Sequence, residues 1–242
     1  MAIDNGFPET ADIETSSEDY ATRFAGKIGQ WLLRVQEEAT LRMLEPYPQA
    51  KILDVGGGHG QLTGALIERG YEVTVLGSSE ECKVRIQKYL DSEQCAFQVG
   101  NVLDMPYPDG AFDVVISYRF LAHVTQWQQF LKELARVASK AVIVDYPTVR
   151  SSNAIAPYLF KFKKGLEGNT RPFVCYQEKD IIDFYESINW VKDRRQGQFF
   201  LPMVLHRALK KPEISSVLEG TSQLLGLNYL FGSPVIAKFR KN

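Results

Sequence analysis

Residues 51–66 read KILDVGGGHGQLTGAL, and they give the clearest indication of the fold. Its first five residues form the short apolar run that is typical of a buried parallel strand. A glycine cluster follows at once, and Leu62, Ala65 and Leu66 then begin a helical pattern. A strand, a glycine turn and a helix in this order form a nucleotide-binding crevice, because glycines let the backbone approach a ligand and the helix start offers unpaired N–H groups.

The glycine spacing separates two kinds of nucleotide site. The pattern is Asp54-x-Gly56-x-Gly58-x-Gly60, and Gln61 stands where a dinucleotide fingerprint needs its third glycine. A plain tight turn would need only one glycine. The pattern resembles motif I of the class I S-adenosylmethionine-dependent methyltransferases, of the type 11-like kind. Asp54 suits a cationic ligand, whereas it would repel a pyrophosphate.

The resemblance implies S-adenosylmethionine as cofactor and S-adenosylhomocysteine as product, with the amino-acid end of the ligand along the loop. The residues that it assigns to the loop contacts are Asp54, Gly56, Gly57, Gly58 and Gly60.

Length and composition argue against several other classes of protein. The 242 residues suit one α/β domain, and 28 basic against 29 acidic residues give no indication of a nucleic-acid partner. The three cysteines are scattered, so we expect no metal site and no disulfide framework. The acidic N-terminus does not read as a targeting signal and no apolar run is long enough to span a membrane, so we expect a soluble cytoplasmic protein.

The expected fold is a Rossmann-like, doubly wound α/β sheet of seven mostly parallel strands with an antiparallel last strand. Residues 1–16 are expected to form a flexible arm and 17–242 a single domain with a cofactor-binding core over 45–146. One long amphipathic helix, capped by Ser16 or Ser17 and stopped by Pro46, should precede the first strand.

The resemblance makes Tyr20, Arg23 and Phe24 of that helix candidates for covering the cofactor. The alternative is that Phe24 belongs to the core and Tyr20 to the surface.

The end of the second strand departs from the family. After YEVTVL at 71–76, an acidic residue should hold the ribose hydroxyls, but the chain has Gly77, Ser78 and Ser79 there, and Glu80 is the first carboxylate. Gly77 and Ser78 are predicted to line the pocket. A serine hydroxyl, Glu80 or the backbone could hold the ribose, and Ser79 could instead cap the next helix, which is expected to run to Leu90.

A second block, residues 100–113, resembles the family pattern G-D-A-x-x-L-P-F-P-D-G-x-F-D. The resemblance places the adenine amino group at Asn101, which keeps a carbonyl acceptor, and the ring at the backbone of Val102. The alternative is an Asn in a turn. Tyr118 is assigned to the cofactor pocket, and His123 follows the fourth strand at the sheet edge where open α/β sheets place their sites.

His123 could take a proton from an acceptor, or could simply pack or cap a helix. His206 is predicted to be structural.

The C-terminal part is expected to carry a helical cap over about 147–189, then a strand at 190–195, a helical pattern from Phe199 to Leu225 and a last strand at 234–239. The family resemblance implies that this last strand is antiparallel and lies beside the fifth. Between Arg150 and Lys211 there are twelve Lys or Arg against six Asp or Glu. This basic, aromatic cap favours an anionic or lipid-linked acceptor or peripheral contact with a membrane, although a solvated helix pair would show the same pattern.

The function predicted from these residues is transfer of a methyl group to a small-molecule or lipid-linked acceptor. A non-catalytic protein that binds S-adenosylmethionine or S-adenosylhomocysteine is the alternative, because Gly77 and Asn101 replace customary carboxylates. A nicotinamide oxidoreductase fits less well, since it should show G-x-G-x-x-G and a strand-two acid. The sequence does not define the oligomeric state.

Overall fold

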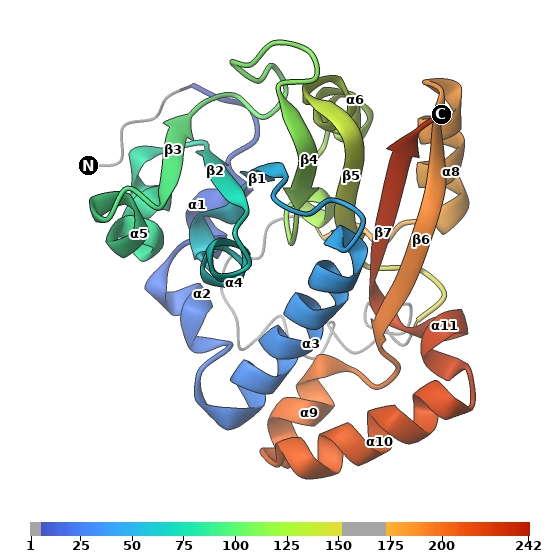
Figure 1. Cartoon of the computed structure of the whole chain (residues 1–242). Helices are drawn as coiled ribbons and strands as arrows, with labels where there is room; N and C mark the ends of the chain where they lie inside the picture. The colour runs from blue at the N-terminus through green and yellow to red at the C-terminus, as the bar shows by residue number, and fades with distance from the viewer. Residues whose placement is uncertain (1–5, 152–172) are drawn as a thin grey trace.

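A seven-stranded sheet forms the centre of the computed structural model, which describes residues 6–151 and 173–242 (Figure 1). The strand order is β3-β2-β1-β4-β5-β7-β6. The strands are β1 Lys51–Val55, β2 Glu72–Gly77, β3 Cys95–Val99, β4 Phe112–Ser117, β5 Ala138–Tyr146, β6 Trp190–Phe199 and β7 Ser233–Lys241. Strands β1 to β5 pair in parallel, and β7 lies antiparallel between β5 and β6. The sequence-based prediction of the fold is therefore confirmed.

The central strands are buried on both faces, which explains their continuous apolar runs. One apolar cluster packs against α6 (Trp127–Val137) and α8 (Glu178–Ser187), and the other against α3 (Gly26–Leu44) and α4 (Thr63–Glu68). Strand β3 lies at an edge of the sheet and alternates half-buried with exposed residues. Helix α5 (Gln87–Asp91) and the 3₁₀ turn Glu80–Ile86 before it connect β2 to this edge.

The single N-terminal helix that the apolar spacing predicts is divided in two. Helix α2 (Glu18–Thr22) ends before a bend, and α3 begins at Gly26, which has a φ of +70°. The bend brings the backbone of Phe24 against α3, where a Cβ on Gly29 would lie 2.1 Å from the Phe24 carbonyl carbon. Apolar periodicity continues through this bend, so it did not reveal the break.

The C-terminal helical pattern is likewise divided. Phe199 ends β6, and three helices follow it, α9 (Met203–Leu209), α10 (Pro212–Leu224) and α11 (Leu227–Phe231). Because β6 runs parallel to β5, its carboxyl end lies at the same edge of the sheet as those of β1 and β4. The three helices extend from that edge, beyond the ends of β6 and β7 (Figure 1).

Two segments of the chain differ in detail from the sequence-based prediction. Of the cap at about 147–189, the structure describes the residues around α8, whereas the Lys-rich aromatic stretch at 158–164 lies outside the described residues. Within the expected N-terminal arm, residues Ala11–Thr15 form helix α1, and Ala11 and Asp12 are buried. No helix in ranges 6–151 and 173–242 has both the length and the apolar character needed to cross a bilayer.

Candidate active site

The glycine loop follows β1 and turns sharply twice. Gly56 and Gly60 have φ values of +74° and +68°, in the left-handed region where a side chain is strained. Between them, Gly57–His59 form a single 3₁₀ turn, and α4 begins three residues after Gly60. The sequence pattern therefore corresponds to a tight loop at the carboxyl edge of the sheet, where open α/β folds bind ligands.

Asp54 lies directly beneath this loop. Its carboxylate is fully buried, and neither of its oxygens has a hydrogen-bond partner among the described residues. A Cβ on Gly57 would lie 2.1 Å from the Asp54 Cγ, so only glycine fits there. Burial raises the pKa of Asp54 to about 7. An unpartnered buried carboxylate is costly unless a cation or donor reaches it, which is what a cationic ligand at the loop would supply.

His59 fills the last position of the loop before Gly60, and sequence reasoning gave it no role. Its Nδ1 accepts a hydrogen bond from the Gln61 N–H at 3.2 Å, and its buried Nε2 has no partner in the described part of the chain. Burial, together with the charges of Arg119 and Arg85, lowers its pKa to about 3. His59 is therefore neutral at physiological pH and cannot supply the cation that Asp54 lacks.

A carboxylate does lie at the end of β2, but it belongs to Asp12, in a distant part of the chain. The Ser78 N–H donates to Asp12 Oδ2 at 2.6 Å, and the Ser78 hydroxyl donates to Asp12 Oδ1 at 2.5 Å. The Cys82 thiol lies 3.3 Å from the same carboxylate, and burial, followed by the charge of Asp12, raises the pKa of that thiol to about 12. Ser79 caps the 3₁₀ turn, since its Oγ accepts from the Glu81 N–H. Sequence reasoning missed Asp12 because it lay in the expected arm.

Helix α1 covers the crevice between the strand ends. Ala11 belongs to the same buried cluster as Val102. The Ser16 hydroxyl lies 2.7 Å from where a Cβ on Gly58 would stand. Before the helix, the Glu9 carboxylate accepts from the Thr125 N–H at 2.8 Å and from its hydroxyl. The segment 9–16, called the N-terminal strap below, is therefore held by two carboxylates, Glu9 and Asp12, and lies over the residues assigned to the cofactor.

Asn101 follows β3, and its side chain closes a local turn. The Oδ1 atom accepts from the Leu103 N–H at 3.0 Å, and the main-chain oxygen accepts from the Asp104 N–H. Val102 is fully buried. The acceptor that the resemblance assigns to adenine is thus already engaged in the turn, although a carbonyl oxygen has a second lone pair.

Tyr118 and Gly77 face the interior of the domain. The Tyr118 side chain is 1% exposed, and its hydroxyl lies 2.9 Å from the Thr40 hydroxyl of α3. A Cβ on Gly77 would lie 2.8 Å from the Cys82 Cβ and 3.0 Å from the Phe97 ring. In this arrangement both residues pack the elements that surround the crevice.

Arg119, which sequence reasoning did not select, adopts a φ of +60° at the end of β4. Its N–H donates to Asp145 Oδ1 at 2.6 Å, and its guanidinium donates to Gln36 and lies 4.1 Å from the centre of the Phe24 ring. Burial raises the pKa of Asp145 to about 6, against the effect of Arg119. The Nη1 atom is buried and unpartnered within the described ranges. The only sequence signal was an arginine directly after an apolar strand.

His123 and Tyr20 lie at the periphery of this group. His123 ends a 3₁₀ turn (Leu121–His123) and packs against the Phe173 ring at 5.7 Å between centroids. Tyr20 packs on Phe24 and lies under the Arg23 guanidinium. The His123 side chain therefore packs on the segment that precedes α8, and that of Tyr20 packs at the α2–α3 bend.

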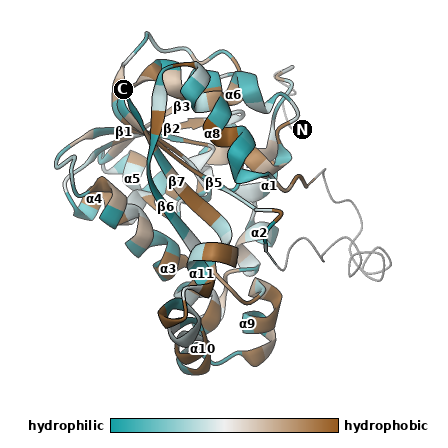
Figure 2. Ribbon diagram, turned by 90° about the vertical axis from the view of Figure 1, so that its right-hand side faces the viewer, coloured by the Kyte–Doolittle hydropathy of each residue, from teal (hydrophilic) through white to brown (hydrophobic). Residues whose placement is uncertain are grey.

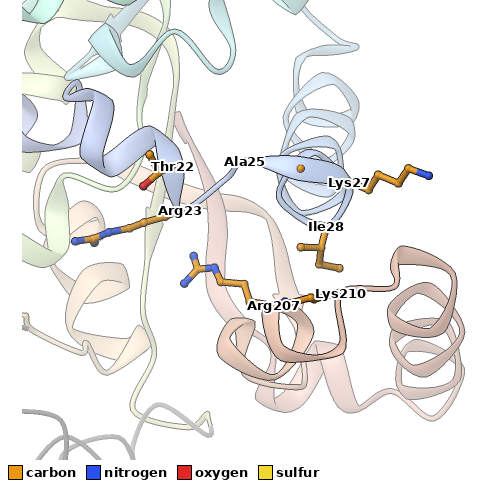
Figure 3. Close-up of a pocket in the computed structure, with 8 residues that line it drawn as sticks. Thr22, Arg23, Ala25, Lys27, Ile28, Arg207 and Lys210 are labelled. Atoms are coloured by element: carbon orange, nitrogen blue, oxygen red, sulfur yellow. The ribbon is translucent and has the colours of Figure 1, made fainter. Parts of the chain in front are cut away.

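A recess of about 380 Å³ lies beside these residues, between the α2–α3 bend and α9 (Figure 3). Four of its lining residues are cationic: Arg23, Lys27, Arg207 and Lys210. Figure 3 shows Arg207 on α9 extending toward Arg23, whereas the Lys27 side chain points away from it. This recess is called the cationic recess below.

Comparison with known proteins supports the assignment made from these residues. A family model described as "Methyltransferase domain" matches residues 53–144, which contain the glycine loop, Asn101 and most of β5. Residues 53–144 therefore match a methyltransferase domain, as the resemblance to class I S-adenosylmethionine-dependent methyltransferases predicts. S-adenosylmethionine is the cofactor of this family, and the domain offers it a buried carboxylate that no described residue pairs, beneath a close-fitting glycine loop, so Asp54 and the loop fit the ligand.

Relatives of the methyltransferase domain include enzymes with different acceptors. Ajmaline N-methyltransferase of Rauvolfia serpentina is 36% identical over 100 residues, which are 38% of this chain and 34% of the relative. Ubiquinone/menaquinone biosynthesis C-methyltransferase UbiE of Cereibacter sphaeroides is 32% identical over 110 residues, which are 43% of this chain and 44% of the relative. The match therefore spans less than half of the length of either relative.

Solved structures share the fold over nearly the whole chain. Magnesium protoporphyrin IX methyltransferase (ChlM) from Synechocystis PCC 6803, solved with bound S-adenosylhomocysteine, has a TM-score of 0.64 at 16% identity. The match covers 95% of this chain and 97% of that one. At this identity the likeness shows that the two chains share a fold.

Proposed function

We propose that this protein transfers the methyl group of S-adenosylmethionine to a small-molecule or lipid-linked acceptor. The observation that carries the proposal is the fully buried Asp54 carboxylate beneath the glycine loop, which has no hydrogen-bond partner among the described residues, on a sheet with the strand order of the family. When bound, the cofactor supplies a methyl group that is already activated by a sulfonium charge. The work left to the protein is therefore mainly binding and positioning.

The residues of the chain divide this work. Asp54 provides the negative charge for a cationic ligand, and the glycine loop lets the backbone approach it. Arg119, fixed through Asp145 and Gln36, holds a positive charge at the end of β4. His123 is the candidate for removing a proton from the acceptor, although an activated methyl donor does not require a general base.

The acceptor class rests on the relatives and on the surface of the chain. Ajmaline N-methyltransferase and the ubiquinone/menaquinone biosynthesis enzyme act, by their names, in the chemistry of small organic molecules. The basic C-terminal part of the chain favours two more specific possibilities, a lipid-linked acceptor and peripheral contact with a membrane. Nothing in the charge balance favours a nucleic acid.

The test is a calorimetric titration of the full chain with S-adenosylhomocysteine, with NADH as the control ligand. We expect micromolar binding of S-adenosylhomocysteine alone. A second titration series with S-adenosylmethionine tests the role of Asp54, because Asp54→Asn should weaken binding of the cationic cofactor at least tenfold, whereas Asp104→Asn, an exposed neighbour of the site, should leave it unchanged.

Binding without turnover on any acceptor would favour the non-catalytic alternative. Binding of neither ligand would contradict the proposed cofactor site.

A further inference from the structure

The three C-terminal helices expose an unusual concentration of apolar side chains. In Figure 2 they form a block that projects from the sheet and carries broad hydrophobic stretches. Outside these helices, the exposed large hydrophobic residues of the described chain are Val84, Val149, Phe173 and Val174. The exposed set on the helices, called the apolar face below, consists of Val204, Leu205, Ile214, Val217, Leu218, Leu224, Leu225, Tyr229, Leu230 and Phe231.

Helix α10 buries polar residues and exposes apolar ones, which is the reverse of an ordinary surface helix. Its buried residues are Ser215, Glu219 and Ser222, all polar, whereas Val217 is 68% and Leu224 90% exposed. An amphipathic helix that only covers a sheet would place its apolar stripe inward. The apolar stripe of α10 therefore faces outward, where it needs an apolar partner.

The outward orientation is fixed by hydrogen bonds. Glu219 accepts from the main-chain N–H groups of Phe200 and Leu201 and from the Asn228 side chain, and it lies 2.9 Å from His206 Nε2. Rotating α10 to bury its leucines would remove this carboxylate from all of its partners. Leaving such groups unpaired in the interior would cost more than burying the leucines would gain, so the apolar face is built into the fold.

The charges beside the apolar face are almost all positive. Between Met203 and Phe231 the charged side chains that are not buried are Arg207, Lys210, Lys211 and Glu213. Arg207 and Lys210 also line the cationic recess, together with Arg23 and Lys27 from the α2–α3 bend (Figure 3). An apolar surface bordered by cations complements an anionic lipid surface, with acyl chains for the side chains and phosphates for the cations.

We propose that the apolar face of α9–α11 docks on an anionic lipid bilayer, with the cationic recess at the level of the headgroups. A second copy of the chain is a poorer partner, because a two-fold contact through this face would bring its cationic borders toward each other. The proposal goes beyond methyl transfer, since docking requires neither cofactor nor acceptor. It also differs from the sequence-based expectation, which placed membrane contact on the cap at about 147–189.

The experiment is co-sedimentation of the full chain with vesicles of phosphatidylcholine alone or with about one third phosphatidylserine. We expect binding to the anionic vesicles only. The double substitution Leu224→Ser and Leu225→Ser should reduce binding more than tenfold, because both side chains are exposed and would enter the bilayer. Lys210→Glu with Lys211→Glu should reduce it by a similar factor.

Matched controls are Val84→Ser, an apolar residue elsewhere that is 63% exposed, and Lys132→Glu on α6, which should both bind like the wild type. Absence of binding by the wild type, or binding that survives the leucine substitutions, would overturn the proposal. Dimerisation of the wild type that the leucine substitutions abolish, without vesicle binding, would assign the face to a second copy instead. Titration with S-adenosylhomocysteine in the same preparations tests the cofactor site separately.

Discussion

Two buried carboxylates of this protein have opposite surroundings. Glu219 sits among the C-terminal helices with donors from His206, Asn228 and two main-chain N–H groups, whereas Asp54 sits beneath the glycine loop with none from the described residues. Burial acts to raise the pKa of both, but hydrogen bonds outweigh it at Glu219 and lower its pKa, while the pKa of Asp54 rises to about 7. A carboxylate with internal partners holds a fold together, and one without them is available to a ligand.

The largest effect is expected at the satisfied carboxylate. Glu219→Ala leaves His206, Asn228 and two N–H groups without their acceptor and opens a cavity, so the free energy of unfolding should fall by about 4–5 kcal/mol. Denaturant unfolding measures this loss. Glu213→Ala, at an exposed position of the same helix, should change it by less than about 0.5 kcal/mol. If Glu219→Ala lowered the free energy of unfolding only slightly, Glu219 would not be a carboxylate that holds the fold together.

The charge of Asp54, in contrast, should lower the stability of the fold, by an amount that depends on pH. Because its pKa is raised in the folded state, its ionisation destabilises the fold as pH rises from about 4 to about 7. His59, with its lowered pKa, contributes stability above pH 6.5 that is lost as pH falls toward 3, so the two slopes oppose each other.

The comparison with Asp54→Asn isolates the contribution of Asp54. Between pH 4 and pH 8, the free energy of unfolding of the variant should rise by about 4 kcal/mol relative to that of the wild type, as measured by chemical unfolding at each pH. Parallel pH profiles for the two proteins would show that Asp54 has a partner when folded.

The N-terminal strap provides a smaller and kinetic test. Asp12→Asn removes the charge that accepts two hydrogen bonds from Ser78, so the free energy of unfolding should fall by about 1–3 kcal/mol. Because the strap lies over the cofactor residues, the association rate of S-adenosylhomocysteine should rise roughly tenfold, which stopped-flow fluorescence can follow. Asp19→Asn, exposed on α2, is the control. An unchanged association rate would place the strap outside the entry path.

The smallest effect is expected at Ser79. Its hydroxyl caps the 3₁₀ turn after β2, so Ser79→Ala should lower the free energy of unfolding by about 0.5–1 kcal/mol and leave the affinity for S-adenosylhomocysteine unchanged within about twofold. Thermal unfolding and calorimetric titration measure the two quantities. A loss of affinity without a loss of stability would assign the hydroxyl to the ligand.

Local patterns predicted the strands and the glycine loop, since each depends on residues that are neighbours in the chain, whereas the antiparallel direction of the last strand was predicted from the family resemblance. The same reasoning failed at the bend between α2 and α3, because apolar spacing continues through it. It also missed Asp12 and Arg119. Asp12 gains its role from a contact with Ser78, 66 residues away, and such a contact leaves no periodic signal.

The strands, the glycine loop and the class of cofactor follow from the amino-acid sequence, because strand periodicity and glycine spacing are set by backbone geometry over a few residues. Which carboxylates have partners, and which face of α10 is exposed, depend on how the folded chain packs. Helical spacing places the apolar residues of α10 on one stripe but does not say which way the stripe faces. That direction is set by hydrogen bonds from Asn228 and the chain at Phe200 to Glu219, which form only when distant segments have packed together.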